Sequence, residues 1–468
     1  MDSQRGFCPG RAGFAQVAVK GEIQKWNGTK VIVLGIGRSG QAAAEWLLGQ
    51  KAEVTMFDET KSAEAKSLAQ KWEKRGIRVL LGKDRMEAVN FDQAILSPGI
   101  DPKRPVVRQL VDAGVPILGE LELGSQACLC PIVAVTGTNG KSTTTELIAS
   151  VFSTAGKKAV GCGNLGRPLC EVAPLTGGLD WVVVEVSSFQ LETVVTFRPK
   201  VAVYLNLTPD HLDRYPSVEK YAEAKARIFL NQKAEDFAVV QKGLEVETGK
   251  ATVASFTSDA DGADYTIRDG WLCRGEEQLM RQEETSLRGP HNAENMLAAW
   301  AVAEFEKISR EAVKEAFRNY RALPHRCELV RVLGGVRWVN DSKATNLDAM
   351  ERAVAGTEGS VILIAGGKDK GFDFSESRKR LAGKIRGALL VGEMAEKIEK
   401  AWNGVVPCRR VRDLEEAVER AAKMAVSGET VLLSPGCSSY DMFKNFEERG
   451  EKYRQCVTAL PEEKKRNE

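Results

Sequence analysis

Residues 132–145 read IVAVTGTNGKSTTT and connect an apolar run to a stretch with a helical pattern. Backbone N–H groups in a glycine-containing loop such as residues 137–140, here called the phosphate loop, form a concave site for anions. The positive end of a following helix strengthens that site. Lys141 can reach the β- and γ-phosphates of a nucleotide, and the Ser142 hydroxyl can ligate Mg²⁺. The stretch predicts an ATP site, although Val135 stands where the strict G-x-x-x-x-G-K-S/T pattern has its first glycine.

Short apolar runs rich in β-branched residues recur on both sides of this stretch, and helical patterns separate them. Strands that are buried on both faces have this composition. The runs are Val31–Leu34, Val54–Phe57, Ala94–Leu96, Ile132–Val135, Trp181–Val186, Val201–Leu207, Val361–Ala365, Ala388–Val391 and Val431–Leu433. Their alternation with helices predicts a parallel α/β fold with more than one sheet.

The chain has 468 residues, which is enough for about three domains. We place the boundaries near 119 and 322, which divides the chain into residues 1–119, 120–322 and 323–468. The segment 232–288 is more polar and alternates between apolar and polar residues, which indicates a small antiparallel appendage. Residues 1–28 carry little pattern and form an uncertain lead-in.

The composition is that of a globular protein, with 43% hydrophobic and 28% charged residues. The formal charge is only +2, because 66 Lys and Arg residues are balanced by 64 Asp and Glu residues. This balance gives no support for nucleic acid or a membrane surface as a partner. No apolar run approaches the roughly 20 residues that cross a bilayer, and we expect no signal peptide. The ten cysteines form no CxxC pair, which indicates reduced thiols in a cytoplasmic protein.

A second glycine-rich turn, GIGRSG at residues 35–40, follows the first predicted strand. Asp58 ends the next strand about 20 residues further on, as in dinucleotide-binding folds. Glycines in such a turn allow backbone N–H groups to approach a diphosphate. The alternative is a tight strand-to-helix turn that binds nothing. The position of the turn directly after a strand favours a nucleotide diphosphate.

Three further groups are candidates for metal binding or for reactive chemistry. Glu185 ends a buried strand, where a carboxylate is well placed for Mg²⁺, although helix-capping or loop roles are common there. His211 follows another buried strand among acidic residues and is either a ligand or a structural histidine. Lys225 shares a helical face with Tyr221 and Phe229. It is either a snorkelling lysine or a buried amine with a depressed pKa that can react.

Three predicted strands in the last third end in loops that carry Lys, Ser, Thr or Asp side chains. These loops are Asn340–Asn346, Gly366–Lys370 and Ser434–Ser439. Ligands of open α/β sheets bind outside the carboxyl ends of the strands. Lysines together with hydroxyl groups suit a small acid, whereas each lysine alone would be interpreted as an exposed loop residue.

The segments TGTNGKST (136–143), EVSSFQ (185–190), TPDHLDRY (208–215) and PHNAEN (290–295) resemble those of the Mur ligase family. The resemblance continues through LPHRCE, NDSKATN, GGKDKGFDF and SPGCSSYDMFKNFEERG in the last third, and it covers roughly residues 29–460. These later segments, with the GIGRSG start, are similar to the branch of the family that adds D-glutamate to a UDP-linked muramoyl-L-alanine.

This resemblance implies an ATP-dependent ligase of peptidoglycan synthesis. It implies a Rossmann-like N-terminal domain, a central P-loop ATPase domain with a mostly parallel sheet, and a Rossmann-like C-terminal domain. The acceptor carboxylate would be phosphorylated to an acyl phosphate, which the amine of D-glutamate then captures. ATP and two Mg²⁺ ions would be needed, and Lys225 would be carbamylated. The enzyme would be a cytoplasmic monomer that acts on small molecules, with no nucleic acid or membrane partner.

The resemblance also implies roles for individual residues. For the UDP-linked substrate they are Gly37, Arg38, Ser39, Asp58, Gly99, Asn164 and Gln190. For ATP they are Gly137, Thr138, Asn139, Gly140, Lys141, Ser142, Thr143, Asn292, Asn295, Arg326 and Asp341. For D-glutamate they are Lys343, Thr345, Lys370, Ser439 and Phe446. Ser142 and Glu185 would bind one Mg²⁺, and His211 and Lys225 the other. The catalytic residues would be Lys141, His211 and Lys225.

Other functions are compatible with parts of the sequence. A sibling ligase, either another Mur-type enzyme or a folylpolyglutamate synthase, differs mainly in the C-terminal segments that carry substrate choice. A nucleotide-binding regulatory protein without ligase activity would leave the set of Glu185, His211 and Lys225 without a purpose. A dinucleotide-dependent oxidoreductase would use the GIGRSG turn and leave the phosphate loop unexplained.

Overall fold

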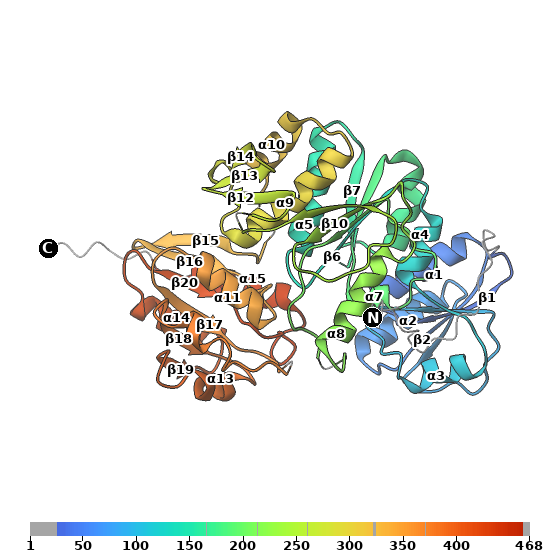
Figure 1. Cartoon of the computed structure of the whole chain (residues 1–468). Helices are drawn as coiled ribbons and strands as arrows, with labels where there is room; N and C mark the ends of the chain where they lie inside the picture. Colours follow the sequence, from blue (N-terminus) through green and yellow to red (C-terminus); the bar gives the residue numbers. More distant parts are fainter. Residues whose placement is uncertain are drawn as a thin grey trace, which may run out of the picture.

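The computed structural model describes residues 26–461 except 165, 213, 260, 322, 323 and 370. Three sheets follow one another along the chain, and helices cover each of them. The three resulting α/β domains lie in a row, with the middle domain in the centre (Figure 1). The three-domain α/β fold expected from the sequence is thereby confirmed, whereas the boundaries at 119 and 322 stay a prediction.

The N-terminal sheet has five parallel strands in the order β3-β2-β1-β4-β5. Chain order reverses between β1 and β4, and ligands of such sheets bind beyond the strand ends at that point. The GIGRSG turn leads from β1 into α1 and therefore lies at this point. The elements are β1 (Lys30–Leu34), α1 (Arg38–Gly49), β2 (Glu53–Asp58), α2 (Ala63–Glu73), β3 (Arg78–Leu81), β4 (Gln93–Leu96), α3 (Pro105–Asp112) and β5 (Ile117–Gly119).

The middle domain is built on a nine-stranded sheet in the order β14-β13-β12-β11-β10-β9-β6-β8-β7. Its first half contains α4 (Glu120–Ala127), β6 (Ile132–Thr136), α5 (Lys141–Thr154), β7 (Ala159–Gly163), α6 (Leu169–Val172), η1 (Ala173–Gly178), β8 (Trp181–Glu185), α7 (Ser188–Leu191) and β9 (Val201–Tyr204). The central strand β6 is buried at all five of its positions, as its apolar composition predicts. The phosphate loop follows it directly.

The second half of the middle domain completes the sheet and returns to it with two helices. It contains α8 (Val218–Ala226), η2 (Arg227–Phe229), β10 (Phe237–Gln241), β11 (Thr252–Phe256), β12 (Tyr265–Arg268), β13 (Trp271–Arg274), β14 (Glu277–Arg281), η3 (Gln282–Glu284), α9 (Pro290–Phe305) and α10 (Arg310–Asn319). β12, β13 and β14 pair antiparallel, as the alternation in 232–288 predicts. They extend the central sheet at its edge, so this segment is not a separate appendage.

The C-terminal sheet has six strands in the order β15-β16-β20-β17-β18-β19, parallel except for the β15–β16 pair. Its elements are β15 (Glu328–Leu333), β16 (Val336–Asn340), α11 (Leu347–Gly356), β17 (Val361–Ala365), α12 (Arg378–Leu381), β18 (Ile385–Leu390), α13 (Ala395–Trp402), β19 (Cys408–Arg410), α14 (Leu414–Met424), β20 (Thr430–Leu433) and α15 (Phe446–Thr458). The carboxyl ends of β16, β17 and β20 are adjacent, so the three polar loops predicted for a small acid meet at one edge.

The hydrophobic cores connect the N-terminal and middle domains to each other but not to the C-terminal domain, among the described residues. One cluster of buried side chains combines Val31 and Met56 of the N-terminal sheet with Leu123 and Cys170 of the middle domain. Among the described residues, no such cluster combines side chains of the middle and C-terminal domains. The N-terminal and middle domains therefore share a core, whereas the C-terminal domain has a core of its own.

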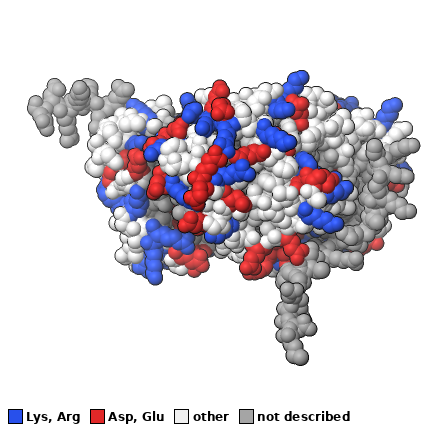
Figure 2. Space-filling view, turned by 45° about the horizontal axis from the view of Figure 1, so that its top comes forward, with Lys and Arg blue, Asp and Glu red and all other residues white. Residues whose placement is uncertain are grey.

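The surface carries both signs of charge. On the face in Figure 2, Lys and Arg side chains are interspersed with Asp and Glu side chains, and neither sign covers a large area. This agrees with the formal charge of +2. In the part of the chain that the structure describes, no helix combines the length and the apolar composition needed to cross a bilayer.

Candidate active site

The phosphate loop connects β6 to α5 and needs glycine at two positions. Gly140, directly before α5, has a φ of 84°, and a Cβ atom there would lie 2.3 Å from Oδ1 of Asn295. Gly137 has a φ of 148° and lies against Leu205. Only glycine adopts such φ values readily. The first N–H groups of α5 have no partners within the helix, so this end of the helix suits phosphate.

Asn206, just after β9, holds the phosphate loop from the neighbouring strand. Its Oδ1 accepts a hydrogen bond from the N–H of Asn139 at 2.8 Å, and its Nδ2 donates to the carbonyl of Asn139 at 3.0 Å. The N–H of Thr138 donates to the carbonyl of Asn206 at 3.0 Å. We did not predict a role for Asn206, because an asparagine after a strand is an ordinary turn residue.

Lys141 begins α5 and turns back over the phosphate loop. Its Nζ donates to the carbonyls of Gly137 and Thr138 at 2.9 and 2.8 Å. The ammonium group of Lys141 therefore lies beside the loop that the sequence assigns to the phosphates, where it can balance their charge. Thr143, which is also predicted to bind ATP, lies in the first turn of the same helix and is buried.

Glu185 ends β8 and accepts a hydrogen bond from the hydroxyl of Ser142. Asn164 donates to its other oxygen at 2.8 Å. Burial would raise the pKa of this carboxyl. The positive charges of Lys141 and Lys343, together with the two hydrogen bonds, outweigh burial and lower the pKa below its usual value. The ionised carboxylate and the adjacent hydroxyl are hard oxygen ligands of the kind that Mg²⁺ prefers.

Lys225 on α8 is only 1% exposed. Its Nζ donates to the carbonyl of Gly137 at 2.7 Å and lies 4.5 Å from the ring centroid of Tyr221. Burial, followed by the positive charge of Lys141, lowers the pKa of this amine well below its usual value, although Asp210 and Glu185 oppose the shift. Lys225 is therefore a buried lysine and not a snorkelling one. The lowered pKa favours the neutral form of the amine, which can react.

His211 follows β9 in the left-handed backbone region, with a φ of 54°. Its ring lies 4.8 Å from that of Phe189 and 6.0 Å from that of Tyr221. Nε2 of His211 is 3.8 Å from Oδ2 of Asp210. His211 and Lys225 thus both contact the ring of Tyr221, so the two residues predicted for the second Mg²⁺ lie in the same region. A positive φ at a residue other than glycine is uncommon and is concentrated at functional sites.

Asn292 and Asn295 lie in the first turns of α9, beside the phosphate loop. Oδ1 of Asn295 accepts a hydrogen bond from the hydroxyl of Thr144 at 3.2 Å, and its Nδ2 donates to Oδ1 of Asn292 at 3.3 Å. Because Asn295 also touches Gly140, the structure brings these two predicted ATP residues to the loop.

Arg326 connects the C-terminal domain to the residues predicted to bind ATP. Its Nη2 donates to the hydroxyl of Ser142. The buried Asp341 accepts hydrogen bonds from the Ser434 hydroxyl at 2.9 Å and from the N–H of Cys327 at 3.1 Å. Burial raises the pKa of Asp341 to about 6. Through its hydrogen bond to the N–H of Cys327, Asp341 holds in place the residue that follows Arg326.

The predicted D-glutamate residues gather at the edge of the C-terminal sheet, on the loops after β16 and β20. Nζ of Lys343 lies 3.8 Å from the ring centroid of Phe446. Burial, followed by the charge of Arg326, lowers the pKa of Lys343 to about 8. Ser439 is buried and Thr345 is half-buried. The remaining predicted residue, Lys370, lies outside the described residues.

The predicted UDP residues lie around the GIGRSG turn. Gly37 precedes α1, and Arg38 and Ser39 begin it. The carboxylate of Asp58 accepts hydrogen bonds from the N–H of Ile36 at 3.0 Å and from that of Thr60 at 2.8 Å. In this structure Asp58 therefore shapes the turn itself.

A small pocket lies where the N-terminal and middle domains meet. Its lining includes Ser97, Pro98 and Ile100 of the N-terminal domain, together with Gln190 of the middle domain. The side-chain oxygen of Gln190 accepts a hydrogen bond from the N–H of Ser187 at 2.9 Å and caps α7. Of the two predicted substrate residues, Gln190 lines this pocket, whereas Gly99 is next to two lining residues in the sequence.

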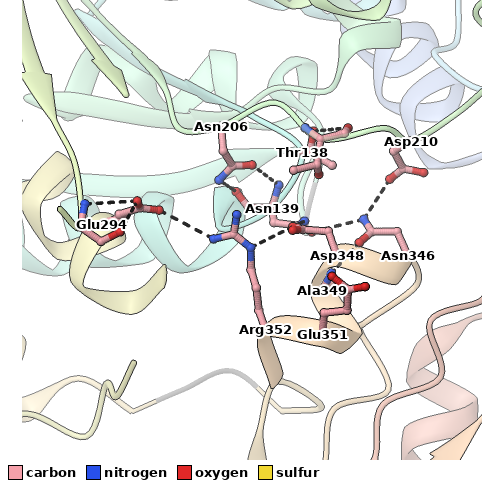
Figure 3. A network of polar contacts seen from close by, with 12 residues as sticks. Thr138, Asn139, Asn206, Asp210, Glu294, Asn346, Asp348, Ala349, Glu351 and Arg352 are labelled. Atoms are coloured by element: carbon pink, nitrogen blue, oxygen red, sulfur yellow. Dashed lines mark hydrogen bonds and ion pairs between the residues drawn. The ribbon is translucent and has the colours of Figure 1, made fainter. Parts of the chain in front are cut away.

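Figure 3 shows that Asp348, Arg352 and Glu294, for which we predicted no role, lie close to the phosphate loop. Asn139 lies between Asn206 of the middle domain and Asp348 of the C-terminal domain, and Arg352 extends toward Glu294. Among the described residues, no group of three or more His, Cys, Asp or Glu side chains could hold a metal ion. Any Mg²⁺ bound here therefore needs other oxygen ligands, such as hydroxyl, phosphate or carbamate oxygens.

Known proteins match this chain along nearly its whole length. The family description "Mur ligase MurD-like, N-terminal domain" matches residues 29–119, "Mur ligase middle domain" matches 135–303, and "Mur ligase, glutamate ligase domain" matches 325–437. A protein of Caldanaerobacter subterraneus named UDP-N-acetylmuramoylalanine–D-glutamate ligase is 39% identical over 444 residues, which cover 92% of this chain and 98% of the relative. A Myxococcus xanthus protein of the same name is 40% identical over 451 residues and covers 93% and 99%.

Solved structures share the fold at lower identity. The UDP-N-acetylmuramate-alanine ligase of Thermotoga maritima superposes with a TM-score of 0.60 at 17% identity, covering 92% of this chain and 99% of that one. A MurF ligase of Thermotoga maritima, solved with ADP, gives 0.58 at 17% identity and covers 93% and 96%. With the matches to all three family descriptions and the relatives at about 39% identity, the chain belongs to the Mur ligase family.

Proposed function

We propose that this protein is an ATP-dependent ligase that joins D-glutamate to UDP-N-acetylmuramoyl-L-alanine in the synthesis of peptidoglycan precursors. The relatives at about 39% identity carry the corresponding name. The observation that supports the chemistry most directly is the meeting of two domains at Ser142. Arg326 of the C-terminal domain donates to this hydroxyl, and the charge of Lys343 lowers the pKa of the neighbouring Glu185. These contacts support a single site in which residues predicted for phosphate lie beside residues predicted for an amino acid.

The first step joins two anions. The carboxylate of the acceptor attacks the γ-phosphorus of ATP, the new P–O bond forms as the bond to the β-phosphate oxygen breaks, and ADP leaves. Lys141 and Arg326 offset the repulsion between the carboxylate and the phosphate, because both carry fixed positive charge beside the loop. Without such charges the repulsion between the two anions would raise the barrier to this step.

Two Mg²⁺ ions would supply further positive charge and orient the phosphate oxygens. Ser142 and Glu185 fit one ion, because they present a hydroxyl and an ionised carboxylate in contact. His211 and a carbamylated Lys225 fit the other. A carbamate forms when the neutral lysine amine bonds to CO₂ and releases one proton, and the product is an anion with two oxygen ligands. The burial and lowered pKa of Lys225 support this modification.

The second step forms the amide. The neutral amine of D-glutamate attacks the acyl carbon, the C–N bond forms, and phosphate leaves with the electrons of the C–O bond. The nitrogen gives up one proton, which the leaving phosphate can accept. Lys343, Thr345, Ser439, Phe446 and Lys370 would hold the amino acid. The mainly protonated Lys343 attracts a carboxylate of glutamate, and Phe446 lies against its ammonium group.

The proposed substrates also indicate where and how the protein acts. UDP-linked precursors and ATP are cytoplasmic compounds, so we place the reaction in the cytoplasm. The three domains of one chain contribute all the groups named above, which supports a monomer. Light scattering of the purified protein measures the mass directly, and a dimer would contradict this part.

The deciding experiment measures phosphate release from ATP with the UDP-linked acceptor and a panel of amino acids. We expect release only with D-glutamate, formation of the amide, and no turnover in Lys141→Ala. Release with another amino acid or with a folate acceptor would identify a sibling ligase. ATP binding without release for any combination would identify a nucleotide-binding protein.

A further inference from the structure

One helix of the C-terminal domain, α11, contacts the phosphate loop. Nδ2 of Asn139 donates to Oδ2 of Asp348 at 2.6 Å, and Nδ2 of Asn346, the N-cap of α11, lies 3.3 Å from Oδ1 of Asn139 (Figure 3). Asn346 also donates to Asp210 at 3.1 Å. The first turn of α11 therefore lies directly on the loop that the sequence assigns to the phosphates.

The polar groups of Asn139 are divided between two domains. The main-chain N–H and carbonyl pair with Asn206 of the middle domain. The side-chain amide pairs with Asn346 and Asp348 of the C-terminal domain. If the C-terminal domain moved away, the main chain would keep its partners and the side chain would lose both of those contacts. The conformation of this side chain therefore depends on the position of α11.

Arg352 extends the contact from the phosphate loop to α9. Its Nε donates to Oδ2 of Asp348 at 2.9 Å, one turn earlier on α11, and its Nη1 lies 3.8 Å from Oε2 of Glu294. Glu294 is itself held by Gln241 at 3.0 Å and by the hydroxyl of Ser258 at 2.8 Å. α9 carries Asn295, which touches Gly140, so α11 spans both elements of the ATP site.

These contacts are charged and partly shielded from solvent. The side chains of Glu294, Asp348 and Arg352 are 8%, 20% and 30% exposed. Hydrogen bonds to ionised groups are stronger than neutral ones, and salt screens them when solvent reaches them. No hydrophobic cluster among the described residues joins the middle and C-terminal domains, so polar contacts such as these determine how firmly the C-terminal domain docks.

We propose that Asp348 and Arg352 are positioning residues that set the side chain of Asn139 and the start of α9 only while the C-terminal domain is docked. We call the Asn139–Asp348–Arg352–Glu294 chain of contacts the α11 latch. Because coupling between two equilibria is reciprocal, nucleotide in the phosphate loop favours docking, and docking favours the loop geometry that uses the nucleotide. The catalytic part of this inference rests on the proposed ligase function.

Glu351 provides a matched control on the same helix. It lies beside the latch in Figure 3, but its carboxylate accepts a hydrogen bond from Arg380 within the C-terminal domain. Glu351→Gln removes one negative charge from α11, as Asp348→Asn does, without touching a contact between domains. Effects of helix charge or stability alone would therefore appear in both variants.

Small-angle X-ray scattering tests the latch without using ligase activity. For the wild-type chain we expect the radius of gyration to rise when NaCl is raised to about 0.5 M, where charged contacts are strongly screened. A non-hydrolysable ATP analogue with Mg²⁺ should reverse this rise. Asp348→Ala and Arg352→Ala should be expanded already at low salt and respond little to the analogue, whereas Glu351→Gln should behave as wild type.

Kinetics tests the positioning role. Asp348→Ala should lower kcat about tenfold, because small misplacements of groups that position substrate lower the rate on this scale, with a melting temperature like that of Glu351→Gln. Asp348→Asn keeps an acceptor for Asn139 but loses the charge that holds Arg352. Its kcat should therefore fall less than that of Asp348→Ala, and it should depend less on salt concentration than the kcat of the wild type.

The outcomes separate the two proposals. The latch would be overturned if Asp348→Ala had the same radius of gyration and the same kcat as the wild type. It would also be overturned if Glu351→Gln changed both quantities as much as Asp348→Ala does. If the wild-type chain forms no amide, the proposed function fails, and the scattering experiment still decides whether α11 docks through these residues.

Discussion

Lys225 illustrates how burial changes the chemistry of a single residue. A lysine on an amphipathic helix usually extends its ammonium group into water. Lys225 is instead enclosed, with Nζ on the carbonyl of Gly137 and against the ring of Tyr221. Its lowered pKa follows from desolvation and from the nearby charge of Lys141. A neutral amine in this position is what a carbamate needs.

Added short carboxylates should therefore partly restore the activity that is lost when Lys225 is replaced. We expect Lys225→Ala to lose about 100-fold or more in kcat, as for other groups that stabilise a transition state, and to recover partly with acetate or propionate. The control is Lys220→Ala on the same helix, because Lys220 is exposed and pairs only with Glu223 among the described side chains. Full activity of Lys225→Ala without added carboxylate would argue against the carbamate.

The pH dependence of glutamate binding should report on Lys343. A lysine is charged below its pKa, and the pKa of Lys343 is lowered to about 8. The attraction for the glutamate carboxylate is therefore present at pH 7 and lost as the pH rises through about 8. We expect the KM for D-glutamate to rise above pH 8 in the wild type.

Lys343→Arg separates this effect from titration of the substrate, because arginine stays charged throughout this range. Its KM, whatever its value at pH 7, should change less between pH 7 and 9 than that of the wild type. Equal pH profiles for the two enzymes would exclude Lys343 as the titrating group.

The junction between the elements β6 and α5 depends on Gly137 and Gly140, and Gly140 directly precedes the helix. Gly140 has a φ of 84°, and a Cβ atom on this residue would lie only 2.3 Å from Oδ1 of Asn295. Gly156, after the same helix, has a φ of 78° but nothing within 4 Å of the corresponding position. The two positions share a positive φ, which would strain any other residue, and differ in crowding.

Alanine at these two positions should therefore have different consequences. Gly156→Ala should cost about 1 kcal/mol of stability from backbone strain and leave nucleotide binding unchanged. Gly140→Ala should destabilise the protein more and weaken ATP binding at least tenfold, because Asn295 and the loop must both shift. Thermal unfolding and calorimetric titration with ATP measure the two effects. Equal nucleotide affinity in both variants would show that the crowding at Gly140 is unimportant.

At the scale of the whole molecule, the distribution of hydrophobic cores predicts how the domains unfold. The N-terminal and middle domains share a cluster that includes Leu123, whereas the C-terminal core contains Leu363 and is separate. A shared core couples unfolding, and a polar joint does so weakly. We expect two calorimetric transitions, one for the first two domains together and one for the C-terminal domain.

Core substitutions assign the two transitions. Leu123 and Leu363 are both fully buried, and Leu→Ala in a core typically costs about 2–5 kcal/mol. Leu123→Ala should lower only the transition of the joined domains, and Leu363→Ala only that of the C-terminal domain. A single transition that both variants lower equally would contradict the separation.

Local patterns were enough to predict the α/β class and the phosphate loop. Consecutive apolar residues identify strands buried on both faces, and the loop between β6 and α5 places glycines, a lysine and a hydroxyl within a few residues of one another. The polar segment 232–288 was harder, because alternation indicates strands but does not say to which sheet they add. Pairing of β12 with β11 made them the edge of the central sheet.

The strand and helix patterns, the phosphate loop and the family resemblance could be read from the sequence, because they depend on neighbours in the chain. The burial of Lys225 and the contact of Asp348 with Asn139, a residue 209 positions away, became evident only in the folded chain. Burial and desolvation depend on what several distant segments enclose together, and no local pattern records that. The residues that couple the domains were therefore visible only once the three sheets had been assembled.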